Sequence, residues 1–361
     1  MATNNRLMFS TSILLLGAGP VAWSGFMRNR LIALVALVSA PALAHHSVGA
    51  FFDASTTVEV AGEITEVNWR NPHIAFEMTD SDGEAWTLET HSLSIMRRLN
   101  AAEPFVAVGD QVRAAGWPSR RGQGIFVNNM LLPSGEEFVF SFSPEPADLI
   151  WSDRMWGTTE TWFAEAGDDS AEELGIFRTW STTLAGGGVG AFPRNLPLTD
   201  AAQAARESFN PTVDDPLLNC GLKGMPEIMS NPYPLAFHDR GDTIEIQIEE
   251  YDTIRTVYLD ADTAPDPQFS IYGHSTGRWE GDTLVVETTH INWGYLNSRG
   301  VPLSDDVHIL ERFTATDNGG RLEYEGTITD DYAFTEPVPL SKSFVYLPDV
   351  SVEPYECIPN E

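Results

Sequence analysis

Short stretches in which apolar and polar residues alternate recur along most of this chain, and they constrain its fold more than any other feature. Alternation with a period of two places the apolar side chains on one face of a β-strand. Within residues 45–140 we expect a short helix at 91–99 and strands at 58–64, 74–78, 85–89, 111–116 and 124–131. Five short strands with one helix after the third predict a small barrel of the oligonucleotide- and oligosaccharide-binding (OB) type, so the fold class is mostly β.

The same alternation returns in the last part of the chain, over residues 211–361. Strands are expected at 243–250, 254–259, 273–279, 283–289, 307–316, 321–328 and 342–346. The tripeptide Glu280-Gly281-Asp282 predicts a tight hairpin turn between two of them. Antiparallel strands at this short spacing predict a β-barrel or a curved sheet, which usually leaves a ligand-sized interior when it closes.

Residues 141–210 differ in character from the two β regions. Four tryptophans are interspersed with acidic residues here, and a run of three glycines occupies 186–188. This composition predicts a long linker whose tryptophans hold it against a domain surface; stacking of the tryptophans on a sugar is the alternative. A short helix is expected over 199–209, because Thr199 is a good N-cap and Asn210-Pro211 would end the helix.

The region before His45 is typical of an export signal. Arg28 and Arg30 supply a positive charge, residues 31–38 an apolar core too short to span a bilayer, and 42–44 a cleavage site of small residues. We expect a signal peptide over 27–44, with residues 1–26 reflecting a misassigned start; an uncleaved anchor is the alternative. The processed protein would be periplasmic or secreted, with no stable membrane anchor.

The net charge and the two cysteines limit the partners and the compartment. The formal net charge is −31, so a phosphate backbone would be repelled, and nucleic-acid binding is excluded. Export to an oxidising compartment makes a disulfide between Cys220 and Cys357 the expected arrangement. A reactive thiol is the alternative, although neither cysteine lies in a Cys-X-X-Cys motif.

Four of the eight histidines, His45, His46, His73 and His91, lie close to the expected start of the mature chain. Cleavage after Ala44 would give His45 a free α-amine beside its imidazole, which is a chelate that suits copper, and the other three would complete the site. The alternative is structural, because Asn71-Pro72-His73 is also consistent with a turn and a capping histidine. No tight His-X-His or His-Glu-X-X-His spacing is present.

A second candidate site lies in the expected C-terminal barrel, where polar side chains at inward positions need partners or a ligand. The strand over 307–316 puts His308 and Arg312 on one face and Glu311 on the other, which argues against a His308–Glu311 dyad. The candidates for acid–base catalysis are His274, His308, Tyr324 and Asp330, and those for ligand binding are Tyr258, Arg278, Trp279, Glu311 and Arg312. Buried structural polar groups are the alternative.

Two groups of residues resemble known sequences. The chain is similar to an uncharacterised family of exported bacterial proteins, defined as a domain of unknown function, in Ala44-His45-His46-Ser47, Phe52-Asp53, Gly62 and Asn71-Pro72-His73. A later run, Gly273-His274-Ser275, Gly277 and 279–286, resembles a downstream β domain found in similar exported proteins. The resemblance implies export, cleavage before His45 and a two-domain layout, and it implies no activity.

Several large enzyme classes are excluded. The sequence contains no Gly-X-Ser-X-Gly elbow, phosphate-binding glycine loop or dinucleotide fingerprint, which excludes kinases, nucleotide hydrolases and Rossmann enzymes. No cofactor is required by the sequence, and copper is the one that it suggests. We expect the C-terminal barrel to bind a small hydrophobic or carbohydrate-like ligand. The alternatives are a cofactor-independent lyase, hydratase or isomerase, and a periplasmic copper-binding protein.

Overall fold

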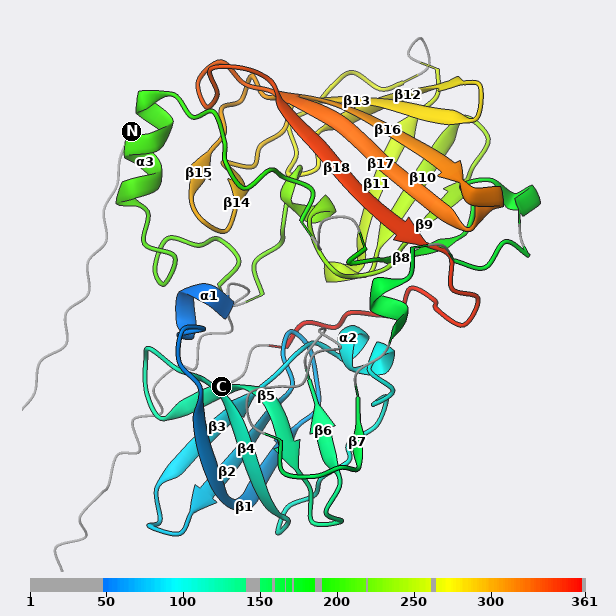
Figure 1. The fold of residues 1–361 in the computed structure, drawn as a ribbon. Helices are drawn as coiled ribbons and strands as arrows, with labels where there is room; N and C mark the ends of the chain where they lie inside the picture. The colour runs from blue at the N-terminus through cyan, green and yellow to red at the C-terminus, as the bar shows by residue number, and fades with distance from the viewer. Residues whose placement is uncertain are drawn as a thin grey trace, which may run out of the picture. The chain divides into compact units, whose positions relative to one another are not determined.

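The computed structural model describes residues 48–140, 150–157, 160–165, 167–170, 172–185, 190–218, 220–260 and 264–358. These residues belong to one compact unit. The expected signal peptide, His45 and His46 lie outside the described residues. The described chain is mostly β, as the alternation predicts, and it forms a small N-terminal barrel and a larger C-terminal barrel (Figure 1).

The N-terminal barrel closes through five strands of the described chain, with one helix after the third strand. The helix is α2 (Leu93–Arg98), and the strands are β1 (Val58–Asn68), β2 (Ala75–Asp80), β3 (Ala85–Glu89), β4 (Gln111–Pro118) and β5 (Gly124–Leu131). β1 pairs antiparallel with both β2 and β4, and β3 pairs parallel with β5, so the sheet returns on itself. β6 (Glu137–Val139) and β7 (Met155–Trp156) extend it beyond β5. The predicted OB-like barrel is confirmed.

Packing inside this barrel follows the alternation in the sequence. Val60 and Ile64 of β1 point inward and join a core with Phe76, Leu88 and Phe138. Between them, Gly62 is held against β2, because a Cβ at this position would lie only 2.2 Å from the Thr79 carbonyl oxygen. Any other residue here would push β1 and β2 apart.

A short helix, α1 (Val48–Phe51), precedes the barrel and is attached to its outside. Phe51 and Phe52 are buried against Phe126 of β5, and Phe52 forms a bridge with Ser119. Burial of these aromatic rings gives the segment a defined position on the barrel.

The C-terminal barrel is closed by nine strands of the described chain, in the order β10-β11-β12-β13-β16-β17-β18-β8-β9. Their bounds are β8 (Thr179–Thr182), β9 (Leu235–Asp239), β10 (Thr243–Ile248), β11 (Thr253–Tyr258), β12 (His274–Glu280), β13 (Thr283–Thr289), β16 (His308–Thr316), β17 (Arg321–Thr329) and β18 (Val338–Val345). β14 (Tyr295–Asn297) and β15 (Val301–Pro302) form a separate hairpin. All pairs in the barrel are antiparallel except β11 and β12, which run parallel where the sequence analysis expects an antiparallel pair.

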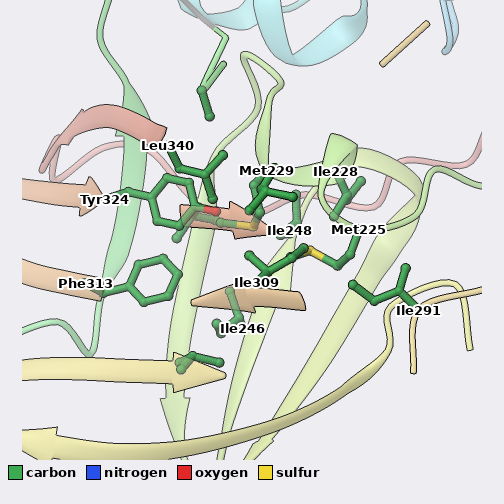
Figure 2. Packing of buried hydrophobic residues seen from close by; sticks show 14 of the residues in the cluster. Met225, Ile228, Met229, Ile246, Ile248, Ile291, Ile309, Phe313, Tyr324 and Leu340 are labelled. Atoms are coloured by element: carbon green, nitrogen blue, oxygen red, sulfur yellow. The ribbon is translucent and has the colours of Figure 1, made fainter. Parts of the chain in front are cut away.

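The interior of this barrel is packed with core side chains (Figure 2). Ile246 and Ile248 of β10 face Phe313 of β16 and Tyr324 of β17, and Met229 packs with them. These residues are at most 2% exposed. Side chains of the strands themselves therefore occupy the space in which barrel closure led us to expect a ligand.

The connecting region contributes to both barrels. Trp162 is buried in the N-terminal core, and Trp180, on β8, is buried in the C-terminal core. The expected helix is α3 (Asp200–Ser208), and Thr199 caps it by accepting a hydrogen bond from Ala202 N at 3.1 Å. Single 3₁₀ turns are η1 (Glu160–Phe163), η2 (Glu172–Leu174), η3 (Glu227–Met229), η4 (Glu250–Asp252) and η5 (Asp317–Gly319).

Candidate functional site

Residues of both barrels line one cavity of about 730 Å³, and several of them are buried ionisable groups. The N-terminal part contributes Val48, Gly49, Ala50, His73, His91, Ser92 and Ile95. The C-terminal part contributes Arg206, Phe209, Pro211, Leu217, Lys223, Glu227, Ser230, Asn231, Pro232, Tyr233, Glu250, Ser298 and Arg299. A hollow of about 810 Å³ over β1, β2 and β4 is lined mostly by exposed or half-buried side chains. Concave sites with buried titratable groups are favoured places for binding and chemistry, so the first cavity is the candidate site.

His73 and His91 are each oriented by a hydrogen bond to a fixed acceptor. His73 Nδ1 lies 2.5 Å from Glu89 Oε1, and His91 Nε2 lies 2.9 Å from the carbonyl oxygen of Phe140. A carbonyl oxygen can only accept, so His91 Nε2 carries the proton. Both rings also contact the ring of Phe126, with centroids 6.3 and 5.2 Å away. Burial, and then the neighbouring His73, lower the pKa of His91 to about 4, so His91 is a neutral imidazole at pH 7.

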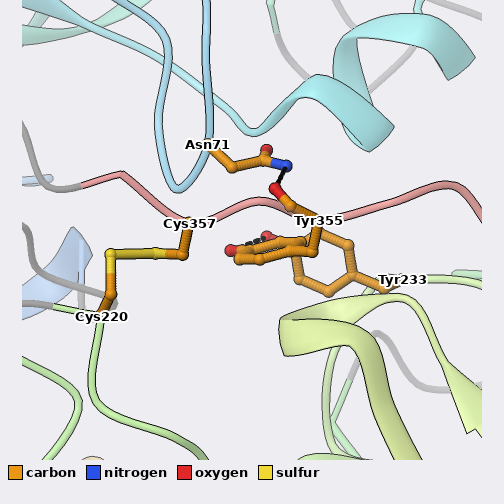
Figure 3. The surroundings of a disulfide bond; sticks show 5 residues. All are labelled: Asn71, Cys220, Tyr233, Tyr355 and Cys357. Atoms are coloured by element: carbon orange, nitrogen blue, oxygen red, sulfur yellow. Dashed lines mark hydrogen bonds between the residues drawn. A yellow bond between two sulfur atoms is a disulfide. The ribbon is translucent and has the colours of Figure 1, made fainter.

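Asn71 fixes the loop that carries His73. Its side-chain nitrogen donates to the carbonyl oxygen of Tyr355 at 2.5 Å (Figure 3). Its side-chain oxygen accepts from Leu93 N at 3.0 Å. Its own carbonyl oxygen accepts from Ile358 N at 3.0 Å. A side chain that joins this loop to α2 and to the C-terminal tail explains why Asn71 is buried. The Asn-Pro-His stretch is thus a structural turn that presents a histidine to the cavity.

The C-terminal tail is held beside the cavity by a disulfide and by tyrosines. Cys220 and Cys357 are bonded, as the sequence predicts. The hydroxyl groups of Tyr233 and Tyr355 lie 3.3 Å apart, with the rings edge to face (Figure 3). Because Tyr233 also lines the cavity, the tail supports one of its walls.

A buried group of charges forms the C-terminal wall. Lys223 Nζ donates to Glu250 Oε1 at 2.7 Å, and both side chains are nearly inaccessible to solvent. Burial lowers the pKa of Lys223, but Glu250, Glu227 and Asp215 together outweigh burial and raise it above its usual value. Burial, together with the charges of Asp215 and Glu250, raises the pKa of Glu227 to about 7 against the opposing charge of Lys223. A carboxyl group with a pKa near 7 is suited to proton exchange.

A second buried polar group lies inside the C-terminal barrel. Arg255 forms two hydrogen bonds with Glu311, at 2.6 and 3.1 Å, and Tyr324 donates to Glu311 at 3.0 Å. Thr288 donates to the same carboxylate at 3.3 Å. Burial, and then the charge of Glu311, raise the pKa of Tyr324 well above its usual value, so its hydroxyl stays protonated. Glu311 and Tyr324 thus lie in the packed interior of the barrel.

The remaining candidates in the C-terminal barrel lie outside its interior. His308 is on the outer face and pairs with Glu287 at 2.6 Å, so Glu311 points the opposite way, as the alternation predicts. Arg278 and Arg312 both bind the exposed carboxylate of Glu280, and Trp279 is 41% exposed. Arg312 lies on the outer face of β16, and Arg278 and Trp279 lie at the exposed end of β12, next to the hairpin turn, which corrects the expectation that these three side chains point inward.

His274, Tyr258 and Asp330 are also separated from the buried group. The rings of His274 and Tyr258 stack with centroids 5.3 Å apart, and both side chains line a hollow of about 340 Å³ at the parallel β11–β12 pair. Asp330 accepts hydrogen bonds from the backbone nitrogens of Ser304 and Tyr332 at 2.7 and 3.0 Å, so it stabilises a loop. The structure therefore brings His73 and His91 to one cavity and distributes the C-terminal candidates over several places.

Four residues of the cavity were not predicted from the sequence: Lys223, Glu227, Tyr233 and Glu250. The first three lie outside the alternating stretches, Glu250 is the last residue of the strand expected at 243–250, and the polypeptide brings the four together from segments on either side of β9 and β10. Their one signal in the sequence is the presence of charged residues among apolar ones, at 223–229 and directly after β10. Such charges are usually exposed, so this signal alone would not have identified them.

Neither a complete metal centre nor a membrane span is found in the described part of the chain. No group of three or more His, Cys, Asp or Glu side chains there is arranged to hold a metal ion. Among the same residues, no helix combines the length and the apolar character that crossing a bilayer requires.

The comparison with known proteins identifies one family. No curated protein matches the chain. The model of a family of unknown function, DUF6152, matches residues 33–127. The match covers α1 and the N-terminal barrel through most of β5, including His73 and His91, and it stops before the C-terminal barrel. Over residues 33–127, the chain is therefore similar to the DUF6152 family, whose function is unknown.

Proposed function

We propose that this protein is exported and binds a copper ion in the cavity through His73 and His91, with His45 and His46 supplying further ligands. The disulfide between Cys220 and Cys357 supports an oxidising compartment, because such bonds are rare in the cytosol. The interior of the C-terminal barrel is filled with side chains, which argues against a ligand-binding site there. The cavity lined by His73 and His91 is therefore the better candidate for the binding site.

The observation that carries the proposal is the way in which the two imidazoles are held. Histidines that bind a metal almost always donate their other ring nitrogen to a carboxylate or a backbone carbonyl, which fixes the tautomer and the orientation of the ring. His73 makes this bond to the Glu89 carboxyl group, and His91 makes it to the Phe140 carbonyl. In the neutral rings, the lone pairs then belong to His73 Nε2 and His91 Nδ1.

The expected mature N-terminus is close in sequence to a residue of this cavity. Val48 lines the same cavity as His73 and His91, and it follows His45 by three residues. Consecutive Cα atoms are about 3.8 Å apart, so three residues of chain span at most about 11 Å. Cleavage after Ala44 would therefore bring an α-amine and two further imidazoles to the cavity.

Copper is the metal that this combination of donors favours. Imidazole and amine nitrogens bind first-row divalent ions with an affinity that is highest for Cu²⁺. The proposed site takes two of its ligands, His73 and His91, from the described residues and the others from the expected N-terminus. Binding should therefore depend on His45 and His46, and hence on cleavage at the expected site.

The test is to express the chain from Met27 in a secreting host, determine the mass of the purified protein, and measure copper and zinc retained after incubation and dialysis. We expect a terminus at His45 and one tightly held copper ion for each chain. His73→Gln and His91→Gln should each weaken copper binding at least 100-fold. One extra residue before His45 should weaken it as well, because the α-amine is then lost as a ligand.

His308→Gln is the matched control, because it makes the same change at a histidine on the outside of the C-terminal barrel. Copper binding should be unchanged in this variant. Since His91 is buried, circular dichroism must show that His91→Gln is folded before its affinity is interpreted. Equal copper retention by the wild type and the His73→Gln/His91→Gln double variant would rule the site out.

A further inference from the structure

The C-terminal wall of the cavity contains a buried carboxylate oxygen without a protein donor. Glu250 is 2% exposed, and its Oε1 accepts a hydrogen bond from Lys223 at 2.7 Å. Its Oε2 has no hydrogen-bond partner among the described residues. A buried carboxylate oxygen that lacks a donor is costly, so this position favours an occupant that can donate a hydrogen bond.

The charges around Glu250 do not balance. The carboxyl groups of Asp215, Glu227 and Glu250 all act on the buried ammonium of Lys223. Glu250 also acts on the buried amine of Lys342, whose pKa burial lowers to about 7. Two arginines, Arg206 and Arg299, also line the cavity, but they are exposed, and solvent screens their effect on buried groups. With all three carboxyl groups ionised, the buried group has an excess of negative charge, which a cation would reduce.

We propose that Glu227 and Glu250 bind the ammonium group of a small organic amine in this cavity. An ammonium group has three donors and no acceptor, which suits two carboxylates, one of them with an oxygen that lacks a donor. Phe209 and Tyr233 contribute aromatic side chains to the same cavity, and Ile95 and Leu217 contribute apolar side chains that suit a carbon chain. The amine site does not depend on the metal.

Binding of an amine should be linked to the loss of a proton from Glu227. The groups that act on Glu227 are Lys223, Asp215, Glu250 and the backbone of Ser298, and they leave its pKa at about 7. At pH 7 a substantial fraction of Glu227 is protonated, and an incoming cation favours the ionised form. Amine affinity should therefore rise between pH 6 and pH 8, with release of a fraction of a proton.

The experiment uses the metal-free mature chain and three probes of similar size, n-butylammonium, n-butanol and butyrate. Titration calorimetry at pH 7, in phosphate and in MOPS, gives the affinity and the number of protons released. We expect butylammonium to bind at least tenfold more tightly than either other probe. Glu227→Gln should weaken its binding at least tenfold and remove the proton release, whereas the exposed control Glu336→Gln should change neither.

Two outcomes would overturn the proposal. One is equal binding of the three probes; the other is unchanged binding and proton release in folded Glu227→Gln. If Glu227→Gln does not fold, the wild-type protein decides, because an affinity for butylammonium that is flat between pH 6 and pH 8 contradicts the linkage. Since the protein is free of metal throughout, a failure here does not bear on copper binding by His73 and His91.

Discussion

The interior of the C-terminal barrel and the cavity both contain a buried carboxylate paired with a buried cation, but the two carboxylates are satisfied to different degrees. In the barrel, both oxygens of Glu311 accept hydrogen bonds from Arg255, and Tyr324 and Thr288 add further donors. In the cavity, one oxygen of Glu250 accepts a hydrogen bond from Lys223, and the other oxygen has no donor among the described residues. A carboxylate whose two oxygens both accept hydrogen bonds from the protein gains little from a ligand. A carboxylate with one oxygen that lacks a donor, next to a cavity, gains a hydrogen bond when a ligand binds.

The comparison separates structural charges from candidate functional ones. Buried charge and a perturbed pKa occur in both regions, so neither property alone identifies a site. The two regions differ in whether a ligand can reach the charges. The Arg255–Glu311 pair lies in the packed interior of the barrel, whereas the Lys223–Glu250 pair lines a cavity. Substitutions in the Arg255–Glu311 pair should therefore change only the stability of the fold. Substitutions of Lys223, Glu227 or Glu250 should change ligand binding and the pH dependence of stability.

The disulfide should have the largest effect on stability. Cys220→Ser/Cys357→Ser opens a loop with a sequence separation of 137, and the chain-entropy model gives a loss of about 5 kcal/mol in the free energy of unfolding. Because the tail donates to and accepts from Asn71, its release should also weaken copper binding by the nearby His73. Urea unfolding followed by circular dichroism measures the first effect, and metal retention the second.

The reduced wild-type protein is the control for this variant, and its unfolding curve should coincide with that of the double serine variant. A loss below about 1 kcal/mol would mean that the hydrogen bonds of the tail hold it without the disulfide. The cavity wall at Tyr233, which Tyr355 supports from behind, would then not depend on the covalent bond.

Breaking the barrel pair should have the next largest effect. Arg255→Met leaves Glu311 buried without its cation, and removal of one partner of a buried pair costs about 3–5 kcal/mol. Arg255→Met/Glu311→Leu should recover at least half of the loss, because no uncompensated charge remains. Urea unfolding of both variants tests this. A double variant as unstable as the single one would show that packing, rather than the unpaired charge, dominates.

Much of the architecture could be predicted from the sequence, because alternation reports directly on half-buried strands. It predicted the two barrels and the position of α2, and residue preferences predicted α3 and its cap at Thr199. β8 was missed because it is short and lies in the region taken as a linker, and β9 was missed because it is short. The parallel pairing of β11 with β12 was missed because alternation does not report the direction of a neighbouring strand.

The candidate site could be predicted only in part. His73 and His91 were identified by residue type, since few other side chains suit a transition metal. Glu227 and Glu250 were not, because their burial results from contacts between segments far apart in the sequence. The same alternation that predicted strands failed for Arg278 and Arg312, since a strand pattern gives two faces and does not say which one is inward.

The smallest expected effect on stability belongs to Glu227, and it depends on pH. Burial raises the folded-state pKa of Glu227 from 4.5 to about 7, so between these values the folded protein holds more protons than the unfolded chain. Stability conferred by the protonated form is then fully present below about pH 4.5 and is lost as the pH rises towards 7. Linkage gives a loss of about 2–3 kcal/mol.

Glu227→Gln replaces the carboxyl group with a neutral amide of the same shape, and it should remove this part of the pH dependence. Urea unfolding at pH 5 and pH 8 measures how much the free energy of unfolding changes between the two pH values. Glu336→Gln, at an exposed residue, is the control and should show the same change as the wild type. If Glu227→Gln loses as much stability as the wild type between the two pH values, then Glu227 titrates normally. The cavity would then resemble the barrel interior, with charges that are satisfied by the protein itself, and the contrast between the two regions would fail.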